Sequence, residues 1–365
     1  MKRMIQRCAS AMMAALMTAG AGSMLPAGAV ETVTMPEHIV VLGDSIVLGS
    51  TPDGSTIPSY VELLQEHTKA QMDVYAAPDN TTADVLALLD EQEVQASLAD
   101  ADLIIVSAGM HDILDPFLVK ADEMKNAFGF SHFFDAFSAQ LSDYGISDPN
   151  ELLPYSNELT KAARSNMQTC GANIKTIGER LDTYGGDGTQ IIYLKGYNMM
   201  DNLPFYDTLS ENRQMAYDKI RNPIGVIISE FVNEPIDAIT AARDFDSSVD
   251  AYTFFAGQSE SYTYLSDLNM NPNAAGERYL FEETLSTAGL LLRGDANLDG
   301  KPNSTDASMI LLHAARIGAR QPGILTPTVQ RYVDVIRDDA VNAKDASRVL
   351  IYAAQAGAKL DPNWD

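Results

Sequence analysis

The sequence predicts an α/β fold built on a parallel sheet, followed by a small all-α unit. Short apolar, β-branched runs such as residues 39–42 and 103–106 alternate with segments of helical periodicity, which is the pattern of βαβ units. Near the C-terminus an acidic loop and a helix occur twice, because Asp345 repeats Asp306 at 345 − 306 = 39 residues. We therefore expect one large α/β domain and a separate duplicated helical unit.

The first apolar run leads into the residue around which the large domain is organised. Residues 38–46 read HIVVLGDSI, and we expect a strand buried on both faces with a tight turn at Gly43. Ser45 then lies at the carboxyl end of the strand, where open α/β sheets bind their ligands. A serine beside a helix N-terminus can act as a nucleophile with a backbone N–H for an oxyanion, although Asp44 or Ser45 can equally cap the next helix.

The remaining elements of the large domain follow from periodicity and breakers. The long segment 113–186 is helical and rich in phenylalanine, and it is expected to cap the site, with most of its aromatics in the helix core. The region 212–239 is expected to be helical with breaks at Pro223 and Pro235. Further strands are expected at 73–76, 102–108, 190–194 and 249–254, and further helices at 60–70, 81–89 and 278–292.

The charge of the chain excludes two classes of partner. The formal net charge is −25 over 365 residues. Residues 1–29 contain three basic and no acidic residues, so the chain without them carries −25 − 3 = −28. Such a chain repels nucleic acid and anionic lipid, and we expect neither as a partner. No later stretch is long and apolar enough for a membrane span.

Residues 1–29 have the composition of a secretory signal peptide. A basic start precedes an apolar run, and Ala27-Gly28-Ala29 offers a small-residue cleavage site. We therefore expect a secreted, extracellular protein. Cys170 is then the one cysteine left, so no disulfide within the chain is expected, and it is interpreted as a buried apolar residue.

Three sequence blocks resemble the GDSL, or SGNH, hydrolases. Gly43-Asp44-Ser45 is similar to the family's first block, and Gly109-Met110-His111-Asp112 after the run 102–108 is similar to a later one. Residues 267–276, DLNMNPNAAG, resemble the last block. The resemblance covers about residues 36–290. It implies a flavodoxin-like three-layer α/β/α fold over 30–290 and a serine esterase or lipase activity that needs no cofactor.

This chain departs from the family pattern at the site itself. His111 stands at the family's oxyanion asparagine, and Asn271 stands at its catalytic histidine. Gly109, which begins the block that contains His111, is expected at the oxyanion and substrate site. Asp79 replaces the glycine whose N–H joins the oxyanion hole, where a carboxylate opposes a forming oxyanion. Asp267 matches the family's acid, one residue further upstream than usual.

Two hypotheses follow from these departures. In the first, the module is catalytically inactive and is kept for binding or assembly, because Asn271 cannot carry a proton. In the second it is an active esterase in which His111 serves as the base, oriented by Asp79 or Asp112; His132 in the insertion is a further histidine within the module. A Ser45 Oγ within hydrogen-bond reach of a His111 ring nitrogen favours the enzyme.

The duplicated C-terminal loop has the ligand spacing of a calcium site. Oxygen donors stand at loop positions one, three, five, seven (a backbone carbonyl), nine and twelve, and Gly300 makes the sharp turn at six. The expected ligands are Asp295, Asn297, Asp299, Lys301, Asn303 and Asp306. In the second loop the candidates are Asp334, Asp338, Asn342 and Asp345. Because Ile336 and Asp339 replace a ligand and the glycine there, we expect weak or no Ca²⁺ binding.

Aspartate at position twelve and the duplication make residues 293–365 resemble a type I dockerin. That resemblance implies Ca²⁺ as cofactor and the cohesin domain of a scaffoldin as partner, in a cellulosome-type assembly for polysaccharide degradation. The sequence as a whole therefore predicts a secreted SGNH-like protein acting on, or binding near, acylated plant polysaccharide.

Overall fold

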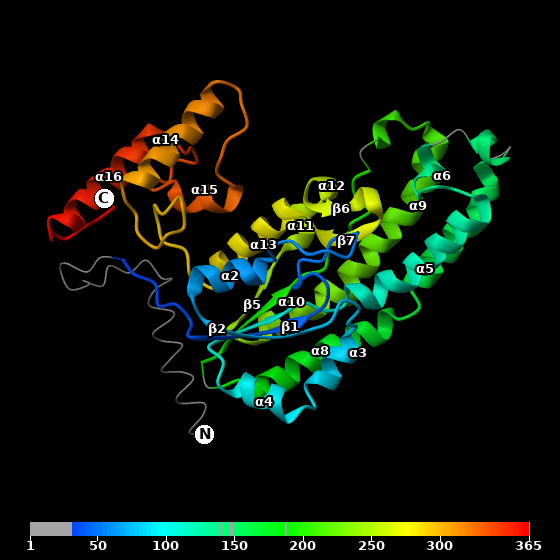
Figure 1. The fold of residues 1–365 in the computed structure, drawn as a ribbon, viewed down its shortest axis with the longest axis horizontal. Helices are drawn as coiled ribbons and strands as arrows, with labels where there is room; N and C mark the ends of the chain where they lie inside the picture. The colour runs from blue at the N-terminus through cyan, green and yellow to red at the C-terminus, as the bar shows by residue number, and fades with distance from the viewer. Residues whose placement is uncertain (1–30, 139–140, 147–148, 187, 204, 365) are drawn as a thin grey trace. The chain divides into compact units, whose positions relative to one another are not determined.

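The computed structural model describes residues 31–364 except 139–140, 147–148, 187 and 204 (Figure 1). The expected signal peptide therefore lies outside the described residues. Contacts divide the chain into two units, which are described separately. The sheet unit comprises Glu37–Leu63 and Ala70–Leu280, and the C-terminal unit comprises the segment before Glu37, Leu64–Lys69 and Phe281–Asp365. Residues 281–292, expected in the larger domain, thus group with the C-terminal unit.

The sheet unit contains the predicted parallel sheet. The strand order is β2-β1-β3-β4-β5, which is the flavodoxin-like order, and all neighbouring strands are parallel. The central strands β1 and β3 are almost wholly buried, as their uninterrupted apolar runs predict. The strands are β1 His38–Gly43, β2 Gln71–Ala76, β3 Leu103–Val106, β4 Gln190–Leu194 and β5 Asp246–Val249.

The last strand is displaced from its predicted position. We expected it at residues 249–254, but β5 ends at Val249 and α11 spans Ala251–Phe255. Asp250 explains the change, because its side chain accepts a hydrogen bond from the Thr253 N–H and caps the helix.

Helices cover both faces of the sheet. Helices α3, α4, α8 and α10 pack together on one face, where α8 contacts the other three. The first turns of α2 and α13 lie on the other face, so the unit has three layers (Figure 1). The bounds are α2 Tyr60–Thr68, α3 Thr82–Leu88, α4 Gln92–Ala99, α8 Met167–Tyr184, α10 Glu234–Ala242 and α13 Ala274–Thr287.

The predicted helical insertion follows β3. Helix α5 packs against α7, and α7 packs against α9. As expected, most phenylalanines of the insertion lie in its core. Phe117 and Phe133, for example, are buried and meet edge-to-face with ring centroids 5.9 Å apart. The elements are α5 Met110–Phe128, α6 Asp135–Ser138, η1 Leu141–Tyr144, η2 Pro149–Leu152, α7 Leu153–Ala163 and, after β4, η3 Tyr206–Thr208 and α9 Glu211–Ile228.

Of the two expected proline breaks, one is found. Pro235 occupies the first turn of α10, where its missing N–H needs no partner, and a short π-helical segment, η4 (Ser229–Asn233), separates α10 from α9. Helix α9 runs through Pro223 without ending. The predicted break at Pro223 is therefore wrong.

A small hairpin returns the chain to the sheet. Strands β6 (Thr263–Tyr264) and β7 (Asn269–Pro272) pair antiparallel, with α12 (Ser259–Tyr262) before them and η5 (Leu265–Asp267) between them. Leu268 closes the turn in the left-handed region at φ 51°. The hairpin brings Asn271, far along the chain from Ser45, into the sheet unit's interior, where Asn271 is buried.

The C-terminal unit repeats one backbone pattern twice. Helix α14 (Ser304–Gly318) and helix α16 (Ala343–Gly357) are both 15 residues long and contact each other, and α15 (Pro327–Val333) lies between them in sequence. Asn303 and Asn342 cap the two helices in the same way, each forming a capping box with the aspartate three residues on. The predicted 39-residue repeat is thus a structural repeat.

Candidate functional site

Ser45 lies directly after β1, in a turn that requires glycine at its entrance. A Cβ on Gly43 would lie 2.8 Å from Val47 Cγ1 and 3.2 Å from the Ser107 carbonyl oxygen. A side chain at this position would therefore clash with its neighbours, which explains the glycine. Residues 45–49 form consecutive turns, with a hydrogen bond from the Val47 N–H to the Asp44 carbonyl. The helix expected directly after Ser45 is therefore replaced by turns, and no helix dipole acts there.

The Ser45 hydroxyl is within hydrogen-bond reach of an imidazole. Ser45 Oγ lies 3.1 Å from His111 Nε2, and both residues are buried. The other ring nitrogen, His111 Nδ1, lies 2.8 Å from Asp115 Oδ1. The three side chains therefore form a continuous Ser–His–Asp arrangement, and the geometric condition set by the sequence is met.

Helix α5 supplies both the imidazole and its carboxylate. His111 lies in the first turn, and Asp115 is four residues later, so both side chains lie on one helix face. Gly109 caps the helix with φ 109°, and a Cβ there would lie 3.3 Å from Cys170 Sγ. Gly109, predicted at the substrate site, thus serves to turn the chain tightly into α5.

Asn271 meets the same hydroxyl from the opposite direction. Ser45 Oγ donates a hydrogen bond to Asn271 Oδ1 at 2.7 Å. The backbone N–H of Asn271 donates in turn to Asn269 Oδ1 at 2.8 Å, which fixes the start of β7. Histidine and asparagine thus both face Ser45, in positions exchanged relative to those that the resemblance implies.

The charges around His111 favour its protonated form. Burial lowers the pKa of His111, but the hydrogen bond that His111 Nδ1–H donates to Asp115 and the negative charges of Asp44, Asp115 and Asp79 outweigh burial and raise that pKa above its ordinary value of 6.5. Burial also raises the pKa of Asp44 to about 6, although the charge of His111 opposes the increase. Asp44 Oδ1 accepts from the Ile46 N–H, whereas its Oδ2 has no partner among the described atoms.

The two carboxylates that were expected to orient His111 lie elsewhere. Asp112 accepts hydrogen bonds from the Thr82 N–H at 2.8 Å and from Thr82 Oγ1 at 2.7 Å, which ties α5 to α3. Asp79 is exposed and influences His111 only through its charge. The orienting position therefore belongs to Asp115, which is not among the candidates predicted from the sequence.

Asp79 belongs to a loop that is hydrogen-bonded to the turn that carries Ser45. Asn80 Nδ2 donates to the Gly43 carbonyl at 2.9 Å, and the Ser45 N–H donates to the Pro78 carbonyl at 3.2 Å. Because the Ser45 N–H already has this acceptor, the described arrangement does not offer it directly to a substrate oxygen.

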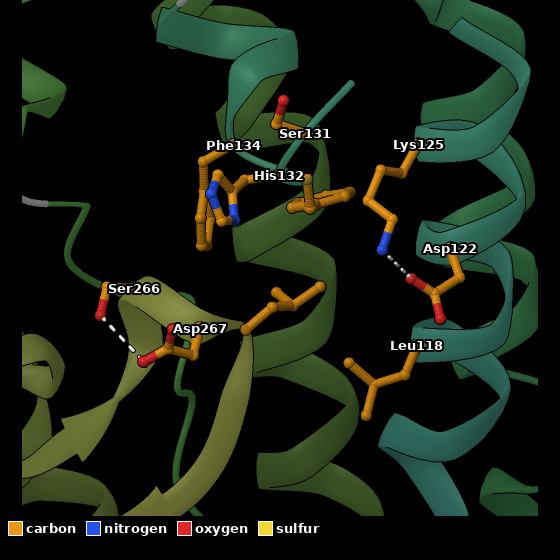
Figure 2. Close-up of a pocket in the computed structure, with 10 residues that line it drawn as sticks. Leu118, Asp122, Lys125, Ser131, His132, Phe134, Ser266 and Asp267 are labelled. Atoms are coloured by element: carbon orange, nitrogen blue, oxygen red, sulfur yellow. Dashed lines mark hydrogen bonds and ion pairs between the residues drawn. The ribbon is translucent and has the colours of Figure 1, made fainter. Parts of the chain in front are cut away.

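Asp267, the acid implied by the family resemblance, is exposed at the β6–β7 turn and accepts a 3.5 Å hydrogen bond from Ser266 Oγ. His132 is also exposed, and both residues line a cavity of about 260 Å³ rather than contacting Ser45 (Figure 2). A sequence signal for Asp115 did exist, because His111 and Asp115 have the i, i+4 spacing of helix neighbours.

The first C-terminal loop is folded around the carboxylates of Asp295 and Asp306. Asp295 accepts from the Gly300 N–H at 2.7 Å, and Asp306 accepts from the Asn303 N–H at 2.8 Å. Gly300 is left-handed, with φ 81°. Burial, together with repulsion from Asp306 and Asp299, raises the pKa of Asp295 to about 6. A donor set of carboxylate, amide and carbonyl oxygens fits Ca²⁺.

The second loop has the same shape with a different charge balance. Asp339 takes the position of Gly300 and adopts φ 61°. Among the residues that the structure describes, Asp334, Asp338 and Asp345 form a group whose carboxylate oxygens lie within 4.8 Å of one another. Lys344 Nζ lies 3.0 Å from Asp338 Oδ2, so an ammonium group already neutralises one of these carboxylates.

No protein-family model matches the chain, and no curated protein matches it. Among solved structures, an extracellular lipase from Streptomyces rimosus is 17% identical, covers 68% of this chain and 99% of its own, and has a TM-score of 0.42. A lipase from a goat rumen metagenome is 16% identical, with coverages of 69% and 97% and a TM-score of 0.39. An acetyl xylan esterase from Geobacillus stearothermophilus is 15% identical, with coverages of 70% and 97% and a TM-score of 0.38.

These three structural neighbours are lipases and an esterase. In the part of the chain that the structure describes, no helix is long and apolar enough to cross a membrane.

Proposed function

We propose that the sheet unit is a serine ester hydrolase whose nucleophile is Ser45 and whose base is His111. The observation that carries this proposal is the unbroken contact from Ser45 Oγ to His111 Nε2 (3.1 Å) and from His111 Nδ1 to Asp115 Oδ1 (2.8 Å). A buried serine acquires nucleophilic character only when a base can take its proton, and this arrangement provides one.

The reaction is an acyl transfer in two halves. His111 Nε2 takes the Ser45 proton as Oγ attacks the ester carbonyl, and the imidazolium then returns that proton to the departing alcohol. Water attacks the acyl-enzyme in the second half, again with His111 as base. Asp115 holds the Nδ1–H tautomer and stabilises the imidazolium.

Asn271 serves the oxyanion in this proposal. Its Oδ1 lies 2.7 Å from Ser45 Oγ, and a half-turn of the amide places Nδ2 at that position. An amide N–H at this place donates to the oxygen that becomes negative when Oγ attacks. The roles of histidine and asparagine are then exchanged between α5 and β7.

The substrate that we propose is an acylated plant polysaccharide, from which a small acyl group is removed.

The alternative is an inactive module retained for binding. It is supported by the Ser45 N–H, which is directed to Pro78, and by the negative charge of Asp79 near the site.

We also propose that the C-terminal unit binds Ca²⁺ and docks to a cohesin domain of a scaffoldin. Two observations support it. The loops fold alike around hard oxygen donors. The two copies also expose equivalent apolar pairs, Leu311 and Leu312 on α14 and Leu350 and Ile351 on α16, each side chain at least 44% exposed. Secretion through residues 1–29 belongs to the same proposal.

The experiment that tests the hydrolase is turnover of p-nitrophenyl acetate by the purified chain. We expect activity in the wild type and a loss of at least about 10³-fold in kcat for Ser45→Ala and for His111→Ala. Equal rates for wild type and Ser45→Ala would refute the enzyme and favour the binding module. Circular dichroism of each variant checks that the fold is retained.

A further inference from the structure

The helix face that carries the base continues into a pocket. His111, Asp115, Leu118, Asp122 and Lys125 follow one another at spacings of four, three, four and three residues, so they lie along one face of α5. The last three line a pocket of about 260 Å³, and Figure 2 shows their side chains extending into it from one side of the helix. The pocket thus begins about two turns along the same helix face from the candidate base, His111.

A second element leads from Ser45 to the same pocket. The opposite wall is the β6–β7 turn, with Ser266, Asp267 and Leu268. Leu268 precedes β7, and Asn271 is three residues further along, which is about 10 Å in a strand. Leu118 lies seven residues beyond His111, also about 10 Å along a helix, and helical side chains lean back toward the N-terminus.

The third wall comes from the helical insertion. Asp135 Oδ2 accepts hydrogen bonds from the N–H groups of Ser131 (3.0 Å) and His132 (2.9 Å), which fixes the backbone of this turn. Phe133 and Phe134 anchor the turn in the core, while the His132 imidazole is exposed at the pocket. In Figure 2, His132 and Phe134 lie across the pocket from Leu118 and Asp122.

The lining selects against a long acyl chain. Six of its ten side chains are polar or charged, among them Asp122, whose carboxylate lies 2.8 Å from Lys125 Nζ, and Asp267. An alkyl chain in this pocket would take these charges out of water without offering them hydrogen bonds. Two carboxylates against one ammonium also disfavour an anionic head group.

We propose that this pocket binds one sugar unit of the alcohol part of the ester. A sugar hydroxyl can donate to Asp122 or Asp267 and accept from Lys125, and the apolar Leu118 and Phe134 suit the carbon faces of the ring. A cavity of about 150 Å³ holds benzene, so about 260 Å³ accommodates a six-membered ring with its hydroxyls. This inference rests on the proposed hydrolase function and specifies its substrate.

The test compares two acetyl esters. The quantity compared is the ratio of kcat/KM on a partially acetylated xylo-oligosaccharide to kcat/KM on p-nitrophenyl acetate. For Asp122→Ala and for Asp267→Ala we expect this ratio to fall at least tenfold, because KM for the oligosaccharide rises. Glu123→Ala is the matched control, because Glu123 pairs with Lys120 on the same helix but does not line the pocket. Its ratio is expected to stay within twofold of wild type.

Two results would overturn the pocket assignment. One is an unchanged ratio in both variants. The other is a selective loss of p-nitrophenyl decanoate hydrolysis in the pocket-filling Ser266→Trp, since this would assign the pocket to the acyl chain. If no Ser45-dependent hydrolysis exists at all, the proposed function fails separately. The pocket is then tested by calorimetric titration of the Ser45→Ala variant with deacetylated xylo-oligosaccharide. We expect this variant to bind the oligosaccharide and the double variant Ser45→Ala, Asp267→Ala not to bind it.

Discussion

His111 Nδ1 and Asp115 Oδ1 lie 2.8 Å apart on neighbouring turns of α5, so a single helix holds both the base and the group that orients it. The side chain of His111 is 6% exposed and that of Asp115 is 40% exposed. The base is therefore sheltered beside Ser45, while its carboxylate partner remains in contact with water. A mutation of Asp115 can therefore test its orienting role while the base, His111, stays in place.

Asp115→Asn is expected to lower kcat by about 10² to 10⁴-fold and to shift the acid limb of the pH profile. His111 must be neutral to accept the Ser45 proton, so activity rises as pH rises through its pKa. Because Asp115 raises that pKa, its removal moves the limb to lower pH. A pH profile of kcat/KM checks this, and an unshifted limb would show that Asp115 does not act on His111. Asp112→Asn, which affects the contact with Thr82, is the comparison variant.

Asn271→Ala is expected to lower kcat by about 10² to 10³-fold, as the loss of one oxyanion donor does. Asn271→Asp separates the two roles of the side chain. It keeps an oxygen that accepts from Ser45 but has no N–H, so we expect a loss at least as large as that of the alanine variant. Near-normal turnover by Asn271→Asp would limit Asn271 to orienting the hydroxyl.

We expect the buried Glu277 to make the sheet unit less stable as pH rises. Burial raises the pKa of Glu277 from 4.5 to about 8, despite the hydrogen bond that Glu277 Oε2 accepts from the Tyr60 N–H. The folded state therefore holds a proton that the unfolded state loses above pH 4.5, and stability declines from there until pH 8. At pH 7 this effect amounts to at most ~3 kcal/mol.

Glu277→Gln removes that pH dependence. We expect its melting temperature to exceed that of wild type at pH 7 and to match it at pH 4, measured by scanning calorimetry. Glu260→Gln, on an exposed residue, is the control and should change neither value. A stabilisation of the same size at both pH values would mean that packing, not titration, is responsible.

Calcium is expected to bind the first C-terminal loop more tightly than the second. Asp295→Ala should remove the tighter phase of a calorimetric Ca²⁺ titration, and cohesin binding with it, whereas Asp334→Ala should change little. The ion pair between Lys344 and Asp338 is one reason, so Lys344→Thr should strengthen the second loop. Equal losses of cohesin binding in the two alanine variants would contradict this ranking.

Much of the framework follows from the sequence for simple physical reasons. The runs at β1 and β3 are buried on both faces, and their uninterrupted apolar residues make them recognisable. The repeat of Asp306 at Asp345 predicts two equivalent loops and helices, and the structure contains them. β5 was misplaced because its sequence DSSV is polar and half-buried, whereas the more apolar segment after it forms a capped helix.

The site was predicted in part. Ser45 and the positions of His111 and Asn271 followed from sequence blocks, but the choice of carboxylate did not. Asp112 is adjacent to His111 in sequence, yet neighbouring residues on a helix point about 100° apart, so it faces Thr82. Asp115 is one turn away and faces His111. The pocket beyond it could not be predicted, since it joins α5 to a turn more than 130 residues later in sequence.

The most direct test of the central claim is covalent labelling of Ser45 by a fluorophosphonate, followed by intact mass and peptide mapping. The serine attacks phosphorus only when a base removes its proton, so labelling reports the Ser45–His111 contact without any assumption about the ester. We predict one label per chain, located at Ser45, and its loss in His111→Ala. An unlabelled wild type, or equal labelling of His111→Ala, would contradict the account.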